Sequence, residues 1–133
     1  MNAEAAGSLD KARDPHSGPV SDAAWAADDQ ARRRGRVEIF NATRPDGLDG
    51  WTMALTQYEL LRSHILDTLT DAGPDGMLLK DLVALTQARL GHHPAFPKGR
   101  LRNYTTYTKV DLEARNLIDR IPNSSPQRIR LSS

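Results

Sequence analysis

The sequence predicts an α+β domain in which three helices are followed by a C-terminal β-hairpin, with a further β-hairpin added before the helices. Apolar residues recur at helical spacing in three segments between residues 56 and 116. Short β-prone runs separated by turn-forming residues lie on either side of these segments. The length of 133 residues suits one ordinary domain.

The folded part is predicted to begin at Arg36. Residues 1–35 are rich in Ala, Asp, Arg, Ser, Gly and Pro and contain few large apolar side chains. Such a segment buries too little apolar surface to offset the entropy lost on ordering. We therefore expect a disordered N-terminal tail at 1–35 and one folded domain at 36–133. A short helix at 21–34, capped by Ser21, is the alternative. The tail is interpreted either as a nucleic-acid-contacting arm or as solvated sequence, including upstream sequence read from a wrong start codon.

The N-terminal β-hairpin is predicted over residues 37–55. Its first strand is the β-prone run 37–41, and Pro45 to Gly47 and Asp49-Gly50 are turn signals. The second strand, 51–55, alternates so that Trp51 and its apolar neighbours point to one side.

The first helix is expected to open at Thr56, which forms a capping box with Glu59, and to stop at Gly73. The second is expected to follow the run Met77 to Leu79 and to end at Gly91, although no capping residue marks its start. The third is expected from about Lys98 to Asn116.

The third helix is predicted to be packed on two sides and open on the remaining one. Leu101, Tyr104, Thr108 and Leu112 share one face of the helical wheel, and Tyr107, Val110 and Ala114 form a second apolar strip. The open face carries Arg102, Thr106, Lys109 and Glu113. After it, strands at 117–121 and 128–131 are joined by a turn rich in Pro, Asn and Ser, which predicts the C-terminal hairpin.

The order of three helices and a hairpin is typical of a winged helix-turn-helix domain. The run from Lys109 to Arg120, KVDLEARNLIDR, resembles the end of a winged-helix recognition helix passing into the first wing strand. Asn116 stands where many such proteins have glycine, and asparagine tolerates the left-handed conformation that ends a helix. The resemblance covers residues 56–131. With its N-terminal hairpin, the chain is also similar to short uncharacterised bacterial winged-helix proteins. The resemblance implies DNA binding, as in a small bacterial transcriptional regulator.

Charge is divided unevenly along the predicted domain. Residues 36–97 hold five basic and eight acidic side chains, whereas residues 98–133 hold eight basic and three acidic ones. A winged helix presents its third helix and its wing to double-stranded DNA. The expected DNA-binding residues are therefore Lys98, Arg100, Arg102, Asn103, Thr106, Lys109, Arg128 and Arg130. The cations would neutralise phosphates, and Arg102, Asn103, Thr106 and Lys109 would reach base edges.

Two further interpretations stay open. The same charges could be ordinary solvated side chains, and Asp111 and Glu113 would repel DNA if they faced it. The chain would then be a non-catalytic protein-interaction or dimerisation module, with Trp51 and Phe40 of the hairpin offering an apolar surface to a partner. Homodimerisation is also left open, because many DNA readers bind symmetric half-sites.

The sequence contains no pattern that predicts an enzyme, a metal site or a cofactor. It has no cysteine, which excludes disulfides and thiolate chemistry. His92 and His93 are adjacent and point apart, so a loop is the simpler interpretation, and His64 is expected to be a half-buried helix residue. No apolar run predicts a membrane span or a signal peptide, so we expect a cytoplasmic protein.

Overall fold

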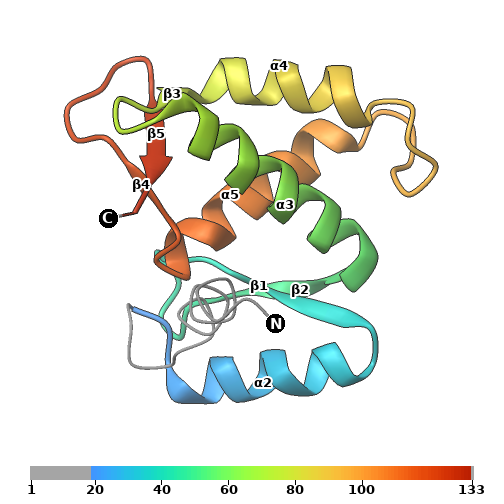
Figure 1. Ribbon diagram of the computed structural model, residues 1–133. Coiled ribbons are helices and arrows are strands. Elements are labelled where there is room, and N and C mark those ends of the chain that lie inside the picture. The colour runs from blue at the N-terminus through green and yellow to red at the C-terminus, as the bar shows by residue number, and fades with distance from the viewer. Residues whose placement is uncertain (1–18, 133) are drawn as a thin grey trace, which may run out of the picture.

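The computed structural model describes residues 19–132, and this part of the chain has an α+β fold. Four helices are present in these residues: α2 (Asp22–Arg33), α3 (Leu55–Ala72), α4 (Leu79–Leu90) and α5 (Leu101–Ala114). They are accompanied by two small antiparallel sheets. Figure 1 shows the N-terminal sheet between α2 on one side and α3 and α5 on the other, with α4 at the opposite end of the molecule from α2.

The N-terminal hairpin is confirmed. Strand β1 (Arg36–Phe40) pairs with β2 (Leu48–Ala54), with Val37 opposite Met53. The register shifts between Glu38 and Phe40. Val37, Ile39 and Met53 are buried in a cluster with side chains of α3 and α5, so the hairpin covers the helices rather than standing apart from them.

The domain boundary predicted at Arg36 is wrong for residues 19–35. Helix α2 packs along β1, as Figure 1 shows, and its Trp25 is only 3% exposed. Trp25 meets Phe40 edge to face at a centroid distance of 5.0 Å. The alternative of a helix capped by Ser21 is confirmed, since the Ser21 side chain accepts a hydrogen bond from the Ala24 amide. A few small apolar residues suffice here because Trp25 alone supplies a large buried area. Residues 1–18, also predicted to be disordered, lie outside the described residues.

The capping box predicted at Thr56 is not formed. Helix α3 begins at Leu55 directly after β2, and its N-cap residue Ala54 makes no side-chain hydrogen bond. The Leu55 amide donates instead to the Gly35 carbonyl at 2.9 Å. A first-turn amide of the helix is thus satisfied by a backbone carbonyl next to the hairpin and not by a capping side chain. The predicted end at Gly73 is confirmed, with Gly73 as C-cap.

The second sheet has three strands rather than the two predicted. Strand β5 (Arg128–Leu131) pairs on one edge with β4 (Ile118–Arg120) and on the other with β3 (Met77–Leu78). The predicted C-terminal hairpin is therefore present. The strand pairing also explains why α4 lacks a capping side chain: the residue before it, Leu78, belongs to β3, and the Leu79 amide donates to the Gln127 carbonyl at 2.9 Å.

Candidate nucleic-acid interface

Helix α5 is shorter than predicted but has the expected amphipathic character. It runs from Leu101 to Ala114 rather than from Lys98 to Asn116. Leu101, Thr105, Thr108 and Leu112 are buried, whereas Arg102, Asn103, Thr106 and Tyr107 are exposed. Asn116 lies just beyond the helix end and has a φ of 66°, which is the left-handed conformation expected for this asparagine. Three of the predicted base-contacting residues thus share one exposed face.

Lys109 is the exception among the predicted residues of this helix. It is 5% exposed, and its ammonium group forms an ion pair with the Glu113 carboxylate one turn later. The helical wheel placed Lys109 beside Arg102 and Thr106, but the neighbouring elements cover this part of the helix. Because Lys109 is buried and paired with Glu113, its ammonium group is not exposed to solvent. Lys109 is therefore not part of the predicted contact face.

The remaining cations of the helix entrance are exposed. Lys98 and Arg100 lie in the loop that leads into α5, and Arg102 lies in its first turn. The Arg100 carbonyl accepts the Tyr104 amide, so the backbone at Arg100 is fixed by the helix even though its side chain is exposed. These three residues are close to one another because they lie within five consecutive positions of the sequence.

The cations of the C-terminal hairpin, Arg128 and Arg130, are less available than the sequence predicts. The Arg128 guanidinium donates to the carbonyls of Asp75 and Gly76, at 3.3 and 3.2 Å, and therefore ties β5 to the turn before β3. Arg130 is half-buried and lies opposite Asp119 in the strand register. Paired residues of a sheet share a face, so a carboxylate accompanies the Arg130 charge.

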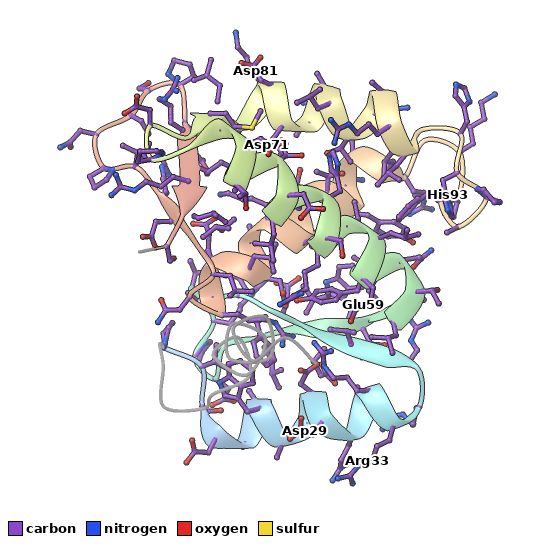
Figure 2. All side chains as sticks on the ribbon, in the orientation of Figure 1. Asp29, Arg33, Glu59, Asp71, Asp81 and His93 are labelled. Atoms are coloured by element: carbon purple, nitrogen blue, oxygen red, sulfur yellow. The ribbon has the colours of Figure 1, made fainter. Side chains whose placement is uncertain are left out.

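A shallow groove adjoins the exposed face of α5. It has a volume of about 820 Å³ and is bounded by α4, α5 and the turn that precedes β5. Arg102 and Thr106 line it from α5, and Lys80 and Gln87 line it from α4. A second groove of about 750 Å³ follows around the loop of His92 and His93, and it shares Gln87 and Arg102 with the first. Figure 2 shows His93 in this loop, beyond the end of α4.

Sequence reasoning missed Lys80 and Gln87. Both lie on α4. Lys80 belongs to the net acidic stretch 36–97, so the charge count hid it, and Gln87 is uncharged, so a charge count could not find it. A separate helical wheel for residues 79–90 would have placed Lys80 and Gln87 with Val83 and Ala84 on one exposed face. Asp81 lies on the outer side of the same helix (Figure 2).

The acidic residues expected to repel DNA do not face outward. Asp111 is wholly buried, and its carboxylate accepts hydrogen bonds from the Tyr58 hydroxyl at 2.5 Å, the Phe40 amide at 2.8 Å and the Arg115 guanidinium at 2.9 Å. Glu113 is paired with Lys109. The exposed face of α5 therefore carries no carboxylate from either residue.

Arg115 is the centre of a buried charge cluster. Its guanidinium also bonds to the Asp28 carboxylate of α2 at 3.0 Å and to the Glu38 carbonyl at 2.9 Å. It lies over the Phe40 ring, with its central carbon 4.0 Å from the ring centroid. Arg115 is one of the eight basic residues counted in 98–133, but it contributes no charge to the surface because α2, β1 and α5 surround it.

The pKa values in this cluster follow from burial and from the shared cation. Burial alone would raise the pKa of Asp28, but the Arg115 and Arg32 guanidinium groups beside it hold that pKa below its ordinary value. Burial raises the pKa of Asp111, although Arg115, Tyr58 and the Phe40 amide oppose the rise. All three partners of Asp111 donate hydrogen bonds, so the two oxygens of its carboxyl group act as the acceptors for all of them.

The apolar surface predicted on the hairpin is only partly present. Phe40 is fully buried and cannot contact a partner. Trp51 is half-buried, stacked against Tyr104 and edge to face with Tyr107. Tyr107 is 44% exposed, so an aromatic cluster of Trp51, Tyr104 and Tyr107 adjoins the exposed face of α5 on the hairpin side.

The histidines form no metal site in the part of the chain described, where no cluster of three or more His, Cys, Asp or Glu side chains occurs. His93 accepts the Ala95 amide through Nδ1, which fits the prediction of a loop residue. His64 is more buried than predicted, at 8% exposure, and its Nε2 lies 2.8 Å from the Thr86 hydroxyl. No helix within residues 19–132 has the length and apolar character needed to cross a membrane.

The comparisons with known proteins identify a family but no activity. Residues 36–129 match the family of unknown function DUF6958. No curated protein and no solved structure matches the chain. Helix α2 lies before the matched residues, although it packs on β1 and supplies Asp28 to the buried cluster. Because the match spans most of its length, the chain belongs to the DUF6958 family.

Proposed function

We propose that the protein binds double-stranded DNA as a winged helix, with α5 as the recognition helix and the β4–β5 hairpin as the wing. The order α3, β3, α4, α5, β4, β5 and the sheet order β3-β5-β4 support this interpretation. In such a domain the third helix enters the major groove. The hairpin β1–β2 and α2 are then additions on the side of α5 away from α4 (Figure 1).

The observation that carries the proposal is the exposed face of α5. Arg102, Asn103 and Thr106 lie on it together, and Lys98 and Arg100 precede it. Arginine and asparagine are the side chains best suited to bidentate contacts with guanine and adenine, respectively. The Thr106 hydroxyl donates to the Arg102 carbonyl at 3.0 Å and keeps its lone pairs for a base donor.

The electrostatic environment of this face also favours a polyanion. Lys80 adds a cation from α4 across the groove, and Lys98 and Arg100 add two from the entrance of α5. Asp111 and Glu113 of the same helix are committed to internal partners. Phosphate contacts of this kind supply affinity that falls as salt rises.

The test is fluorescence anisotropy with labelled duplex DNA over a range of salt concentrations. We expect binding that weakens with salt, and we expect the double variant Arg100→Ala/Arg102→Ala to bind more weakly, with a log-log salt slope shallower by about 2. The matched control is Arg33→Ala/Arg34→Ala, which removes the same charge from exposed residues at the end of α2, and Figure 2 shows Arg33 on the side of α2 away from the hairpin. No binding by the wild type at low salt, or equal loss in both variants, would refute the proposal.

A second candidate function is favoured by the cluster of Trp51, Tyr104 and Tyr107. Exposed aromatic side chains are enriched at protein–protein interfaces. In this alternative, Tyr107→Ala weakens a protein interaction while the Arg100→Ala/Arg102→Ala variant has no effect. The two functions are thus separated by variants in two neighbouring surfaces, the cationic residues at the start of α5 and the aromatic cluster beside them.

A further inference from the structure

The groove between α4, α5 and the turn before β5 combines an apolar floor with cationic walls. Its apolar lining comes from Leu79, Val83 and Ala84 of α4 and from Pro126. Its cations are Lys80 on α4 and Arg102 on α5. The groove therefore has an apolar surface with a cation on either side. A complementary partner would carry a small apolar group with negative charges on either side of it.

The shape of the groove indicates a macromolecule rather than an enclosed small ligand. Six of the nine residues that line it are exposed, so the groove is shallow. Small-molecule sites bury most of their ligand's surface. A shallow groove beside a solvent-facing helix instead suits contact with the surface of a macromolecule. The cations around the groove favour a polyanion.

The major groove of DNA displays one apolar group, the C5-methyl of thymine, between two phosphate backbones. We infer that the α4–α5 groove receives thymine methyl groups on Val83, Ala84 and Pro126, so that the protein prefers A·T-containing duplex DNA. This inference rests on the proposed DNA binding and adds the base class that is read. Lys80 and Arg102 supply the flanking cations.

Gln127 gives a second observation at the same place. Its side-chain oxygen is buried in the lining of this groove and has no hydrogen-bond partner among the described residues. A buried acceptor without a donor is costly, so a rotation of the Gln127 side chain that turns this oxygen into the groove, where a bound partner supplies a donor, is favoured. The adenine paired with thymine displays an N6 amino donor in the major groove, and glutamine is one of the two side chains suited to adenine.

The experiment compares three labelled duplexes that differ only in methyl groups. The first has A·T-rich sequence, the second has deoxyuridine in place of every thymidine, and the third has the sequence of the second with 5-methyl groups restored on alternate uracils. Anisotropy at fixed low salt measures the dissociation constant of each. We expect the uracil duplex to bind about fourfold more weakly for each methyl that is fully buried, and the third duplex to lie between the others.

Variants locate the effect within the groove. Val83→Ser is expected to bring the affinities for the thymine and uracil duplexes together, while affinity for the uracil duplex stays unchanged. Leu85→Ser is the matched control, because Leu85 is 37% exposed on the same helix and does not line the groove. Circular dichroism and thermal unfolding establish that both variants remain folded.

The outcomes separate this inference from the function on which it rests. Salt-dependent binding with equal affinity for thymine and uracil duplexes would overturn the methyl contact and leave DNA binding intact. Equal affinity together with displacement of DNA by poly-glutamate at matched charge would identify a general polyanion surface and also overturn it. Absence of binding to every duplex at low salt would overturn both proposals. A thymine preference lost in Val83→Ser but kept in Leu85→Ser supports the inference.

Discussion

Arg115 and Lys109 show that the charge of a side chain does not determine whether it is exposed or buried. Both belong to the same cationic segment as Arg100 and Arg102, yet both are buried, and each is paired with a carboxylate four residues away on the same segment. Removing one partner of such a buried pair typically costs about 3–5 kcal/mol, because an uncompensated charge remains inside. The exposed arginines carry no such penalty and are therefore the residues to vary in binding experiments.

His64 makes the stability of the fold depend on pH. The Thr86 hydroxyl donates to the Leu82 carbonyl, so the His64 Nε2 must donate to that hydroxyl. Burial and the nearby Arg89 lower the pKa of His64 below its ordinary value of 6.5. The unfolded chain therefore binds a proton at a higher pH than the folded one, and neutral His64 stabilises the fold above pH 6.5.

We expect the free energy of unfolding to fall as pH drops from 6.5 through the lowered folded-state pKa of His64, with a slope of at most about 1.4 kcal/mol per pH unit from this group. Urea unfolding in steps from pH 7.5 downward measures it. In His64→Gln the titrating group is gone, and the slope should flatten over the same interval. A variant whose profile parallels the wild type would show that His64 is not the group responsible.

Strand β3 forms because of another element and not because of its own sequence. The two-residue strand β3 exists through its pairing with β5. That pairing depends on Gly76, which has a φ of 66° and at which a Cβ atom would collide with the Ile129 carbonyl. Glycine is thus required there both for the backbone conformation and for the close approach of β5.

Gly76→Ala is expected to destabilise the protein more than Gly73→Ala. Gly73 also has a positive φ, of 78°, but a Cβ there would meet nothing within 4 Å. Gly73→Ala should therefore cost about 1–3 kcal/mol from backbone strain alone, because its φ of 78° and ψ of −169° are almost confined to glycine. Gly76→Ala should cost more, because β5 must shift as well. Denaturant unfolding gives both values. Equal destabilisation would mean that β3 and β5 can separate without loss.

At the scale of the whole molecule, α2 closes a core that the rest of the chain leaves open. Asp28 and Trp25 of α2 cover Arg115 and Phe40, and Val20 and Ala24 join the same cluster. Without α2, Arg115 would keep a single buried carboxylate partner, Asp111. The packed core of this chain therefore includes residues that precede those matching its family.

A chain that starts at Arg36 should melt at a clearly lower temperature than the full chain, because it loses the Asp28–Arg115 ion pair and uncovers Phe40. The control is a chain that lacks residues 1–18 and keeps every contact described for α2. Thermal unfolding by circular dichroism is the measurement. If the chain starting at Arg36 melts like the control, α2 is dispensable for the fold.

The sequence by itself determined the elements whose signals are local. The hairpin at 37–55, the stop at Gly73, the amphipathic third helix, the left-handed Asn116 and the C-terminal hairpin all follow from periodicity and turn chemistry, which act over a few residues. The same reasoning predicted Arg102 and Thr106 as residues of one open helix face, and both are exposed.

Only the tertiary structure decided which charges are inside. Asp28 bonds to Arg115 across 87 positions of the chain, and the Phe40 amide bonds to Asp111 across 71. No periodic pattern encodes such pairings, because burial of a charge depends on what surrounds it after folding and not on its neighbours in sequence. For the same reason α2 was predicted as a tail, Lys109 as a surface cation, and the groove with Lys80 and Gln87 was missed.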